Sequence, residues 1–291
     1  MEDASLSPLA PLSALTGPRI RPSLPRPFAA RTLSTGDVAS RFPKAGRGRI
    51  AALAFAHWFA FYAGFAAYVG GLIPGWAFAT VGLAVFIRYF DLTHEEIHTQ
   101  DDGSPLWNGL RYAFSVSGPL QVGYAQLARD HRRHHAYEGT ARDPDRWISG
   151  ASPLLAAFHC LTQPEQAAVR YVRANGVDRG TAISLGLHFA AWTSLACVCT
   201  WPQFLLYNAV VRLGNGASWF VFTYLLHRRE IYGGFAAVPA PGWLRAVWLV
   251  VIGRNNLNAV TYHFLHHAYG FVPARSLPAL SAALTGEAAG K

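Results

Sequence analysis

The stretch FDLTHEEIHTQDD, from Phe90 to Asp102, follows a long apolar run and contains His94 and His98. Residues four apart lie on one face of a helix, with their Cβ atoms roughly 5–6 Å apart. The letters HEEIH also fit the zinc peptidase pattern H-E-x-x-H, in which two helical histidines bind zinc and the glutamate acts as a base. The rest of the sequence decides between such a site and a larger one.

The composition is that of an integral membrane protein. The 291 residues are 52% hydrophobic and only 14% charged, whereas an average soluble domain is roughly 25% charged. The formal net charge of +9 comes from basic residues that flank apolar runs. Such a distribution indicates cytoplasmic loops and contact with anionic membrane lipids, and no nucleic acid partner is expected.

Four stretches approach the roughly 20 apolar residues that a helix needs to cross a bilayer. Their connections, GGLIPG and PQ, carry no charge, so the four form two hairpins, and the positive-inside rule places both termini and the middle segment in the cytoplasm. The predicted spans are Ile50–Val69, Leu72–Phe90, Thr181–Trp201 and Phe204–Leu226. The predicted fold is an all-α, multi-pass membrane protein with a cytoplasmic helical cap.

The segments outside the spans are predicted as follows. Residues 1–49 are rich in Pro, Arg and Ser and form a disordered cytoplasmic tail. This tail has no continuous apolar region, so it is not a secretory signal, and its prolines oppose the amphipathic helix of a transit peptide. Residues 50–284 form the membrane domain and 285–291 a C-terminal tail. The apolar segments Leu106–Leu127 and Trp243–Ile252 are expected to lie in the membrane interface.

Eight of the twelve histidines fall in three clusters, HEEIH, HRRHH and HFLHH. By helical spacing, each cluster is expected to present its imidazoles to one common point. His227 follows the fourth span directly, as His94 follows the second, so the two hairpins are expected to lift ligands toward one cap. The predicted metal ligands are His94, His98, His131, His134, His135, His227, His263, His266 and His267.

This number of histidines argues against a zinc peptidase, which needs two histidines, a third ligand and a water. Nine nitrogen donors fit two octahedral ions better, and imidazole binds iron as well as zinc. Glu95 and Glu96 are then interpreted as outer partners of the ligands or as solvated charges rather than as a base. A histidine-rich metal transporter is a remaining alternative, but it would hold its ligands near the middle of the bilayer.

The three clusters resemble the histidine boxes of the membrane fatty acid desaturase superfamily, H-x(3–4)-H, H-x(2–3)-H-H and (H/Q)-x-x-H-H, in the same order. The segments HRRHHAYEGTARDPDRW and NAVTYHFLHHAYGFVPARSLPAL are also similar to the family's second and third boxes, and the similarity covers roughly Ile50 to Leu284. His227 matches a further ligand of the family. Where some members hold a water through an asparagine, this chain has Thr223, so that role is not expected here.

The resemblance implies two iron ions and O2-dependent attack on an unactivated C–H bond of a lipid chain. A fatty acyl desaturase is the predicted activity, and a hydroxylase or ketolase of a carotenoid or other lipid is the alternative. The chain carries no redox motif of its own, so a ferredoxin or small cytochrome with its reductase is expected to supply electrons. The basic residues expected to steer an acidic electron carrier are Arg132, Arg133, Arg228 and Arg229.

Four polar residues remain in or near apolar segments. Arg212 lies inside the fourth span, where it either extends toward the outer face or lines a substrate tunnel, and it is a candidate substrate-binding residue. His57, His159 and His188 each stand alone and are expected to serve packing or hydrogen bonding rather than metal binding.

Overall fold

The computed structural model describes residues 33–44, 47–99, 118–227 and 242–285. The described residues form helices and connecting turns, with no strand among them. The first part of the chain forms α1 (Thr35–Arg41), α2 (Arg47–Val69) and α3 (Gly75–Thr99). The middle forms α5 (Tyr124–Tyr137), α6 (Arg146–Ser149), α7 (Pro153–Leu161), α8 (Gln163–Asn175), α9 (Arg179–Val198), α10 (Trp201–Trp219) and the π-helix η3 (Phe220–Leu225). The last part forms α11 (Gly242–Val251), α12 (Arg254–Thr261), α13 (His263–Ala268), the 3₁₀ helix η4 (Ala274–Ser276) and α14 (Leu277–Thr285).

Three helices are long and apolar enough to cross a membrane: Gly48–Val69, Gly75–His98 and Arg179–Val198. They correspond to the first three predicted spans. The predicted fourth span, Phe204–Leu226, also forms an unbroken helix through α10 and η3, but it is not among the three. Asn208, Arg212 and Asn215 lower its hydropathy. Many of the residues of α10 are buried inside the structure.

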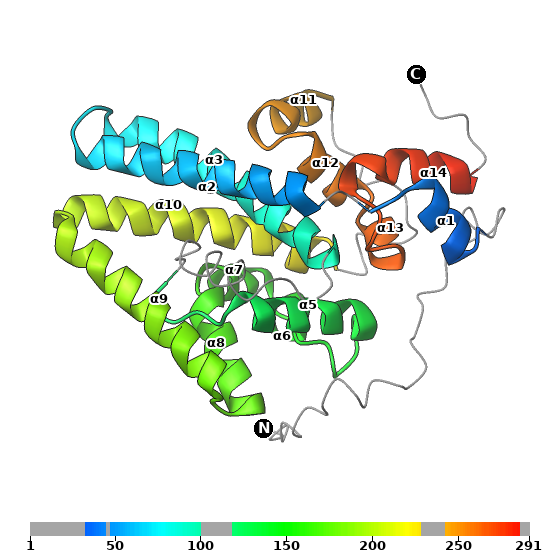
Figure 1. The fold of residues 1–291 in the computed structure, drawn as a ribbon, viewed down its shortest axis with the longest axis horizontal. Helices are drawn as coiled ribbons and strands as arrows, with labels where there is room; N and C mark the ends of the chain where they lie inside the picture. Colours follow the sequence, from blue (N-terminus) through cyan, green and yellow to red (C-terminus); the bar gives the residue numbers. More distant parts are fainter. Residues whose placement is uncertain (1–32, 45–46, 100–117, 228–241, 286–291) are drawn as a thin grey trace.

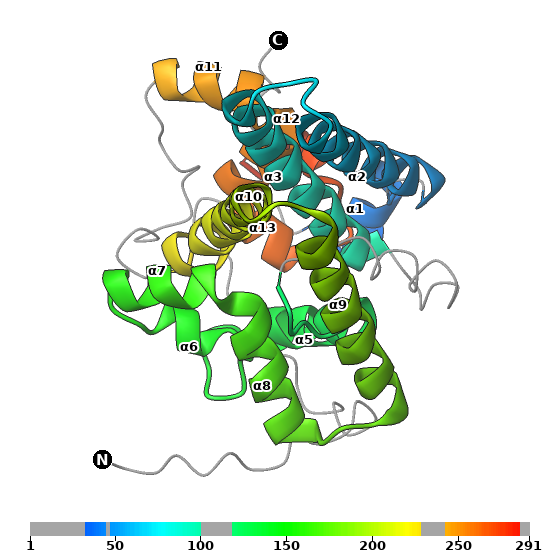
Figure 2. The same ribbon diagram turned by 90° about the vertical axis from the view of Figure 1, so that its left-hand side faces the viewer.

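The hairpin α2–α3 packs along α10 through α3, and these three helices, which we call the long layer, run side by side on the left of Figure 1 with α10 lowest. Its centre is aromatic, with Phe61, Phe65, Phe78, Phe86 and Tyr207 all buried. Gln203, the third residue of α10 and a member of its capping box with Thr200, donates from Nε2 to the carbonyl of Val69 at 3.2 Å, which ties the second hairpin to the end of α2. Both views show α9 running from α10 toward α8 instead of along α2 and α3 (Figures 1 and 2).

A second apolar core joins the end of the long layer to the cap. Leu277, Leu280 and Leu284 of α14 are fully buried against Phe222 and Leu226. Val38 of α1 lies in the same core. The prediction of disorder through residue 49 therefore differs from the structure at Thr35–Arg41. A capping box between Ser34 and Asp37 begins this helix, and burial of Val38 holds it in place.

Two apolar segments were expected in the membrane interface. The segment Trp243–Ile252 forms α11, an apolar helix with no buried residue. Arg88 of α3 donates from Nε and Nη2 to the carbonyls of Val251 and Val250, at 2.9 and 2.6 Å, and so caps its C-terminal end. The expected Leu106–Leu127 helix lies mostly outside the described residues, and its last four residues begin α5.

Candidate metal centre

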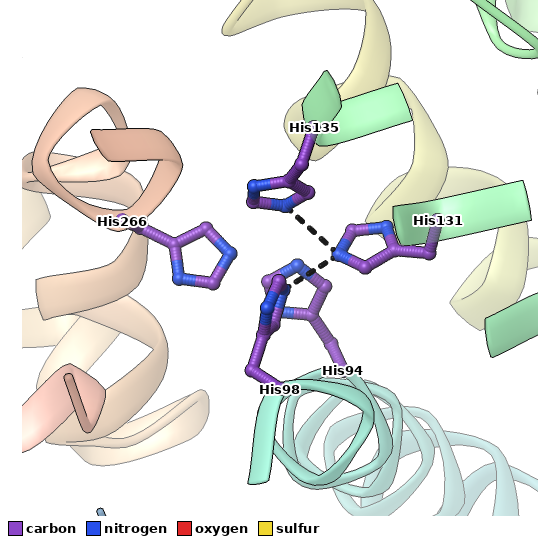
Figure 3. A group of neighbouring side chains, drawn as sticks. All are labelled: His94, His98, His131, His135 and His266. Atoms are coloured by element: carbon purple, nitrogen blue, oxygen red, sulfur yellow. Dashed lines mark hydrogen bonds between the residues drawn. The ribbon is translucent and has the colours of Figure 1, made fainter. Parts of the chain in front are cut away.

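Five imidazoles from three helices converge on one point (Figure 3). Helix α3 supplies His94 and His98, α5 supplies His131 and His135, and α13 supplies His266. One nitrogen from each ring lies within 4.8 Å of one nitrogen from every other. His131 Nε2 lies 2.8 Å from His98 Nε2 and 3.0 Å from His135 Nε2. We call these residues the five-histidine group.

The other four predicted ligands form a second cluster. His134, His227 and His267 also bring their ring nitrogens within 4.8 Å of one another. His227 Nε2 lies 3.0 Å from His134 Nε2 and 3.2 Å from His267 Nε2. His263 Nε2 is 3.1 Å from His267 Nε2. We call His134, His227, His263 and His267 the four-histidine group.

The expectation that each cluster serves one common point is wrong for HRRHH and HFLHH. His131 and His135 join the five-histidine group, whereas His134 joins the other; on α13, His266 is separated from His263 and His267 in the same way. Neighbouring residues of a helix point about 100° apart, while residues four apart share a face. Each H-x-x-H-H box therefore contributes to both groups and joins them.

His227 is positioned by an irregular helix. The chain continues from α10 into the π-helix η3, whose last residue is Leu225, and His227 follows two positions later. A π-helix of this kind often occurs at a functional site because it changes the direction of the residues that follow. Helix α3 likewise runs unbroken through His94 and His98. The predicted ligand residues therefore lie at the end of α3 and just after η3, as expected.

The donor set fits metal ions. His94 Nε2 and His266 Nε2 are buried and have no hydrogen-bond partner in the described part of the chain. Burial and neighbouring imidazoles hold the pKa values of five cap histidines well below the ordinary range, so that these rings are neutral at pH 7; they are His131, His135, His227, His263 and His266. Neutral imidazoles with converging lone pairs bind transition metals. The residues present thus fit two metal ions.

Two carboxylates orient the four-histidine group from outside. His134 Nδ1 lies 2.9 Å from Asp143 Oδ1, and Asp143 also accepts from the backbone N–H groups of Gly139 and Asp145. Burial opposes the charged ring, but this hydrogen bond raises the pKa of His134 to about 9. Such a partner holds Nδ1–H and leaves Nε2 for a metal. This contact gives the Asp-Pro-Asp sequence after the second box a structural role.

The second carboxylate, Glu138, was missed by the sequence analysis. Its Oε2 lies 3.0 Å from His267 Nδ1 and its Oε1 lies 3.5 Å from His227 Nε2. Burial disfavours its ionisation, but His267 and His227 nevertheless lower the pKa of Glu138 to about 2. The available signal was its position three residues after the last histidine of the second box, directly after the end of α5.

Glu95 and Glu96 do not belong to either group. Both side chains are buried, with exposed fractions of 9% and 1%, so the interpretation of these residues as solvated charges is wrong. Two groups made of histidine alone also do not match a zinc peptidase, which has a single zinc and a glutamate that activates water.

A cavity of about 100 Å³, which we call the apolar cavity, adjoins both groups. His94 and His131 of the five-histidine group line it, as do His134, His227 and His263 of the other group. The rest of its wall is mainly apolar or aromatic and comes largely from α3, α10 and η3; it includes Phe86, Phe90, Ile97, Trp219 and Phe222. An apolar substrate group in this cavity would lie beside both metal positions.

The remaining candidates lie elsewhere. Arg212 forms a bidentate ion pair with Glu165 of α8 and donates to the carbonyl of Leu161, and it is not among the residues lining the apolar cavity. His57 and His188 hydrogen-bond through Nδ1 to backbone carbonyls four residues earlier, and His159 packs against Trp147. None of these three histidines joins either group. Arg228 and Arg229 lie outside the described residues.

Three helices long and apolar enough to cross a membrane, together with imidazoles that could hold metal ions, indicate the class of metal-dependent membrane proteins. The sequence pattern of the fatty acid desaturase family matches residues 73–290. The chain therefore belongs to the fatty acid desaturase family, as its three boxes indicated. No curated protein and no solved structure gave a match.

Proposed function

We propose that this protein is a membrane-bound, non-haem di-iron oxidoreductase that uses O2 to desaturate a fatty acyl chain. The observation that supports this most directly is the placement of two histidine groups on one apolar cavity. One iron would bind to His94, His98, His131, His135 and His266, and the other to His134, His227, His263 and His267. When bound, two irons would let O2 and two electrons from an external donor remove two hydrogens from an alkyl chain, with both oxygen atoms leaving as water.

The residues of the chain position the substrate and keep the site dry. Phe86, Phe90, Trp219 and Phe222 form an apolar wall for an alkyl chain and exclude water from the imidazoles. Asp143 and Glu138 fix the ring orientation of His134 and His267, so that the metal positions do not depend on substrate. The chain's contribution is therefore orientation and exclusion of water.

We further propose four membrane spans, α2, α3, α9 and α10 with η3. Helix α10 packs against α3, and the apolar α9 precedes it in a hairpin. Both termini and the histidine groups would then lie on the cytoplasmic side. Reporters fused after Lys291 and within Gln163–Asn175 are expected to report cytoplasm, and a reporter at Gly70–Gly71 the opposite side. A middle segment found outside the cytoplasm would contradict this topology.

Electrons are proposed to come from a ferredoxin or small cytochrome with its reductase. The exposed Arg132 on α5 lies next to a ligand of the five-histidine group and would attract an acidic carrier. Reduction of the purified protein by such a carrier should slow as salt is added, because surface charges are screened. A rate independent of ionic strength would contradict electrostatic steering.

Two measurements test the activity. Protein purified from iron-replete cells should hold two irons per chain, and full activity with a single zinc would contradict the proposal. Lipid mass spectrometry of a host that expresses the protein should show products lacking two hydrogens. Products that have instead gained an oxygen would identify a hydroxylase or ketolase on the same site.

A further inference from the structure

A second, larger cavity lies against the first. It has a volume of about 620 Å³, and its lining includes Arg133, Arg142, Arg146 and Arg170. We call it the basic cavity. It shares part of its wall with the apolar cavity, including Leu127, His131, Asp145 and Trp219. A molecule with a polar end and an alkyl chain could therefore occupy both cavities at once, with its chain beside the histidine groups.

Three arginines of the basic cavity have N–H donors that a ligand could use. Arg133 has an exposed fraction of 8%, and its Nε has no hydrogen-bond partner in the described part of the chain. Arg170 lies 4.4 Å from the ring centre of Trp147, and Arg142 lies 5.6 Å from that of Tyr137. Ring stacking of this kind orients a guanidinium group but leaves its N–H donors unused.

The basic cavity also contains acids, and each lies near a basic group. Asp143 accepts hydrogen bonds from His134 and two backbone N–H groups. Asp145 Oδ2 lies 3.7 Å from His134 Nδ1. Asp130 interacts with Arg133 and Arg129. Among the described residues, no carboxylate lies within ion-pair distance of Arg142, Arg146 or Arg170. These three arginines therefore favour an anion.

The surroundings indicate an anion attached to a lipid. Leu155 lines the basic cavity and belongs to α7, whose outer surface is apolar. Leu154 and Phe158 on that helix have exposed fractions of 87% and 57%. A basic pocket beside an exposed apolar surface matches a membrane lipid, whose charged headgroup lies next to its chains.

We infer that the basic cavity binds the phosphate-bearing headgroup of a membrane lipid whose acyl chain enters the apolar cavity. This inference rests on the proposed function and narrows its substrate class to phospholipids. Arginine suits this role because its planar guanidinium binds two phosphate oxygens at once. The phosphate would stay in the basic cavity while the chain passes the shared wall.

The test compares lipid binding to the purified full-length protein in detergent. The probes are dioleoyl phosphatidylglycerol, dioleoylglycerol with the same chains but no phosphate, and inorganic phosphate. The wild type should bind the phospholipid about tenfold more tightly than dioleoylglycerol, a difference of about 1.4 kcal/mol. Equal affinities would overturn the inference. Inorganic phosphate binding as tightly as the whole phospholipid would assign the cavity to a soluble anion and would also overturn it.

Variants distinguish lipid binding in the basic cavity from a general effect of surface charge. Arg146→Gln combined with Arg170→Gln should remove the preference for phospholipid, whereas Arg146→Lys with Arg170→Lys should keep most of it. Arg173→Gln is the matched control, because Arg173 is an exposed arginine of α8 that does not line the cavity. An equal loss in Arg173→Gln would overturn the inference.

Metal content and binding keep the two proposals apart. The arginine variants should hold as much metal as the wild type, which excludes damage to the histidine groups as the reason for weaker binding. Binding is measured without turnover. A protein that binds phospholipid selectively and oxidises no lipid would contradict the proposed function, whereas one that oxidises a lipid chain without headgroup preference would contradict only the basic cavity.

Discussion

His134 Nδ1 and Asp143 Oδ1 lie 2.9 Å apart, and both side chains are buried. The carboxylate is itself held by the backbone N–H groups of Gly139 and Asp145. The ring of His134 is therefore held in place by Asp143, a loop residue that is not a member of the four-histidine group. A conservative substitution of Asp143 therefore tests whether this contact supports metal binding.

Asp143→Asn is expected to weaken metal binding by the four-histidine group about 10- to 100-fold, the usual effect of losing an outer partner of a histidine ligand. The amide can turn its NH2 toward the ring and stabilise the wrong tautomer. Metal content measured by mass spectrometry against a chelator series checks this. Unchanged affinity would show that Asp143 does not orient His134.

His227→Ala is expected to remove most of the metal from the four-histidine group and abolish activity, because His227 contacts both His134 and His267. The five-histidine group does not include this residue and should keep its metal. His57→Ala is the control, since His57 bonds only to a backbone carbonyl of α2. Normal metal content and turnover in His227→Ala would reduce the site to the eight box histidines.

Gly214→Ala is expected to destabilise the protein by about 1–3 kcal/mol through overpacking. A Cβ atom at Gly214 would lie 2.7 Å from Cδ1 of Phe86, a buried ring that also lines the apolar cavity. Gly186→Ala on α9 is the matched control, because a Cβ there meets nothing within 4 Å. Thermal unfolding in detergent compares the two, and equal midpoints would contradict the close contact.

The metal-free protein is expected to lose stability as the pH falls below about 6.5, the pKa of an unfolded histidine. Five cap histidines have lowered pKa values, so the unfolded chain binds more protons than the folded one in this range; they are His131, His135, His227, His263 and His266. Burial raises the pKa of Asp145 to about 7 and that of Asp130 to about 6, and these carboxyls act in the opposite direction.

Thermal unfolding of the metal-free protein across this pH range measures the effect. His134 does not contribute to this loss of stability on acidification. Its pKa is raised to about 9, so its stabilising effect on the folded state is already complete below pH 6.5. Bound metal should make the slope between pH 7 and 6 steeper, since metal binding releases protons from the folded protein while the unfolded chain still takes them up. A midpoint that rises on acidification would contradict the assignment of neutral rings.

The sequence predicted the long apolar helices, because long apolar runs leave few alternatives. It also predicted that His94 and His227 extend from such helices, since no breaker follows Phe90 or Leu226. It did not predict which histidines belong to which of the two groups, because His134 and His135 are neighbours in the sequence and differ only by one helical step. Nor did it predict Glu138 or the helix at Val38, both of which depend on partners far away in the chain.

The division of each H-x-x-H-H box between the two groups makes the groups depend on each other. Helix α13 supplies His266 to one group and His263 and His267 to the other. Without this helix the first group would have four imidazoles and the second only two. A single displacement of α13 would therefore leave both sets of donors incomplete, and neither group could lose this helix alone.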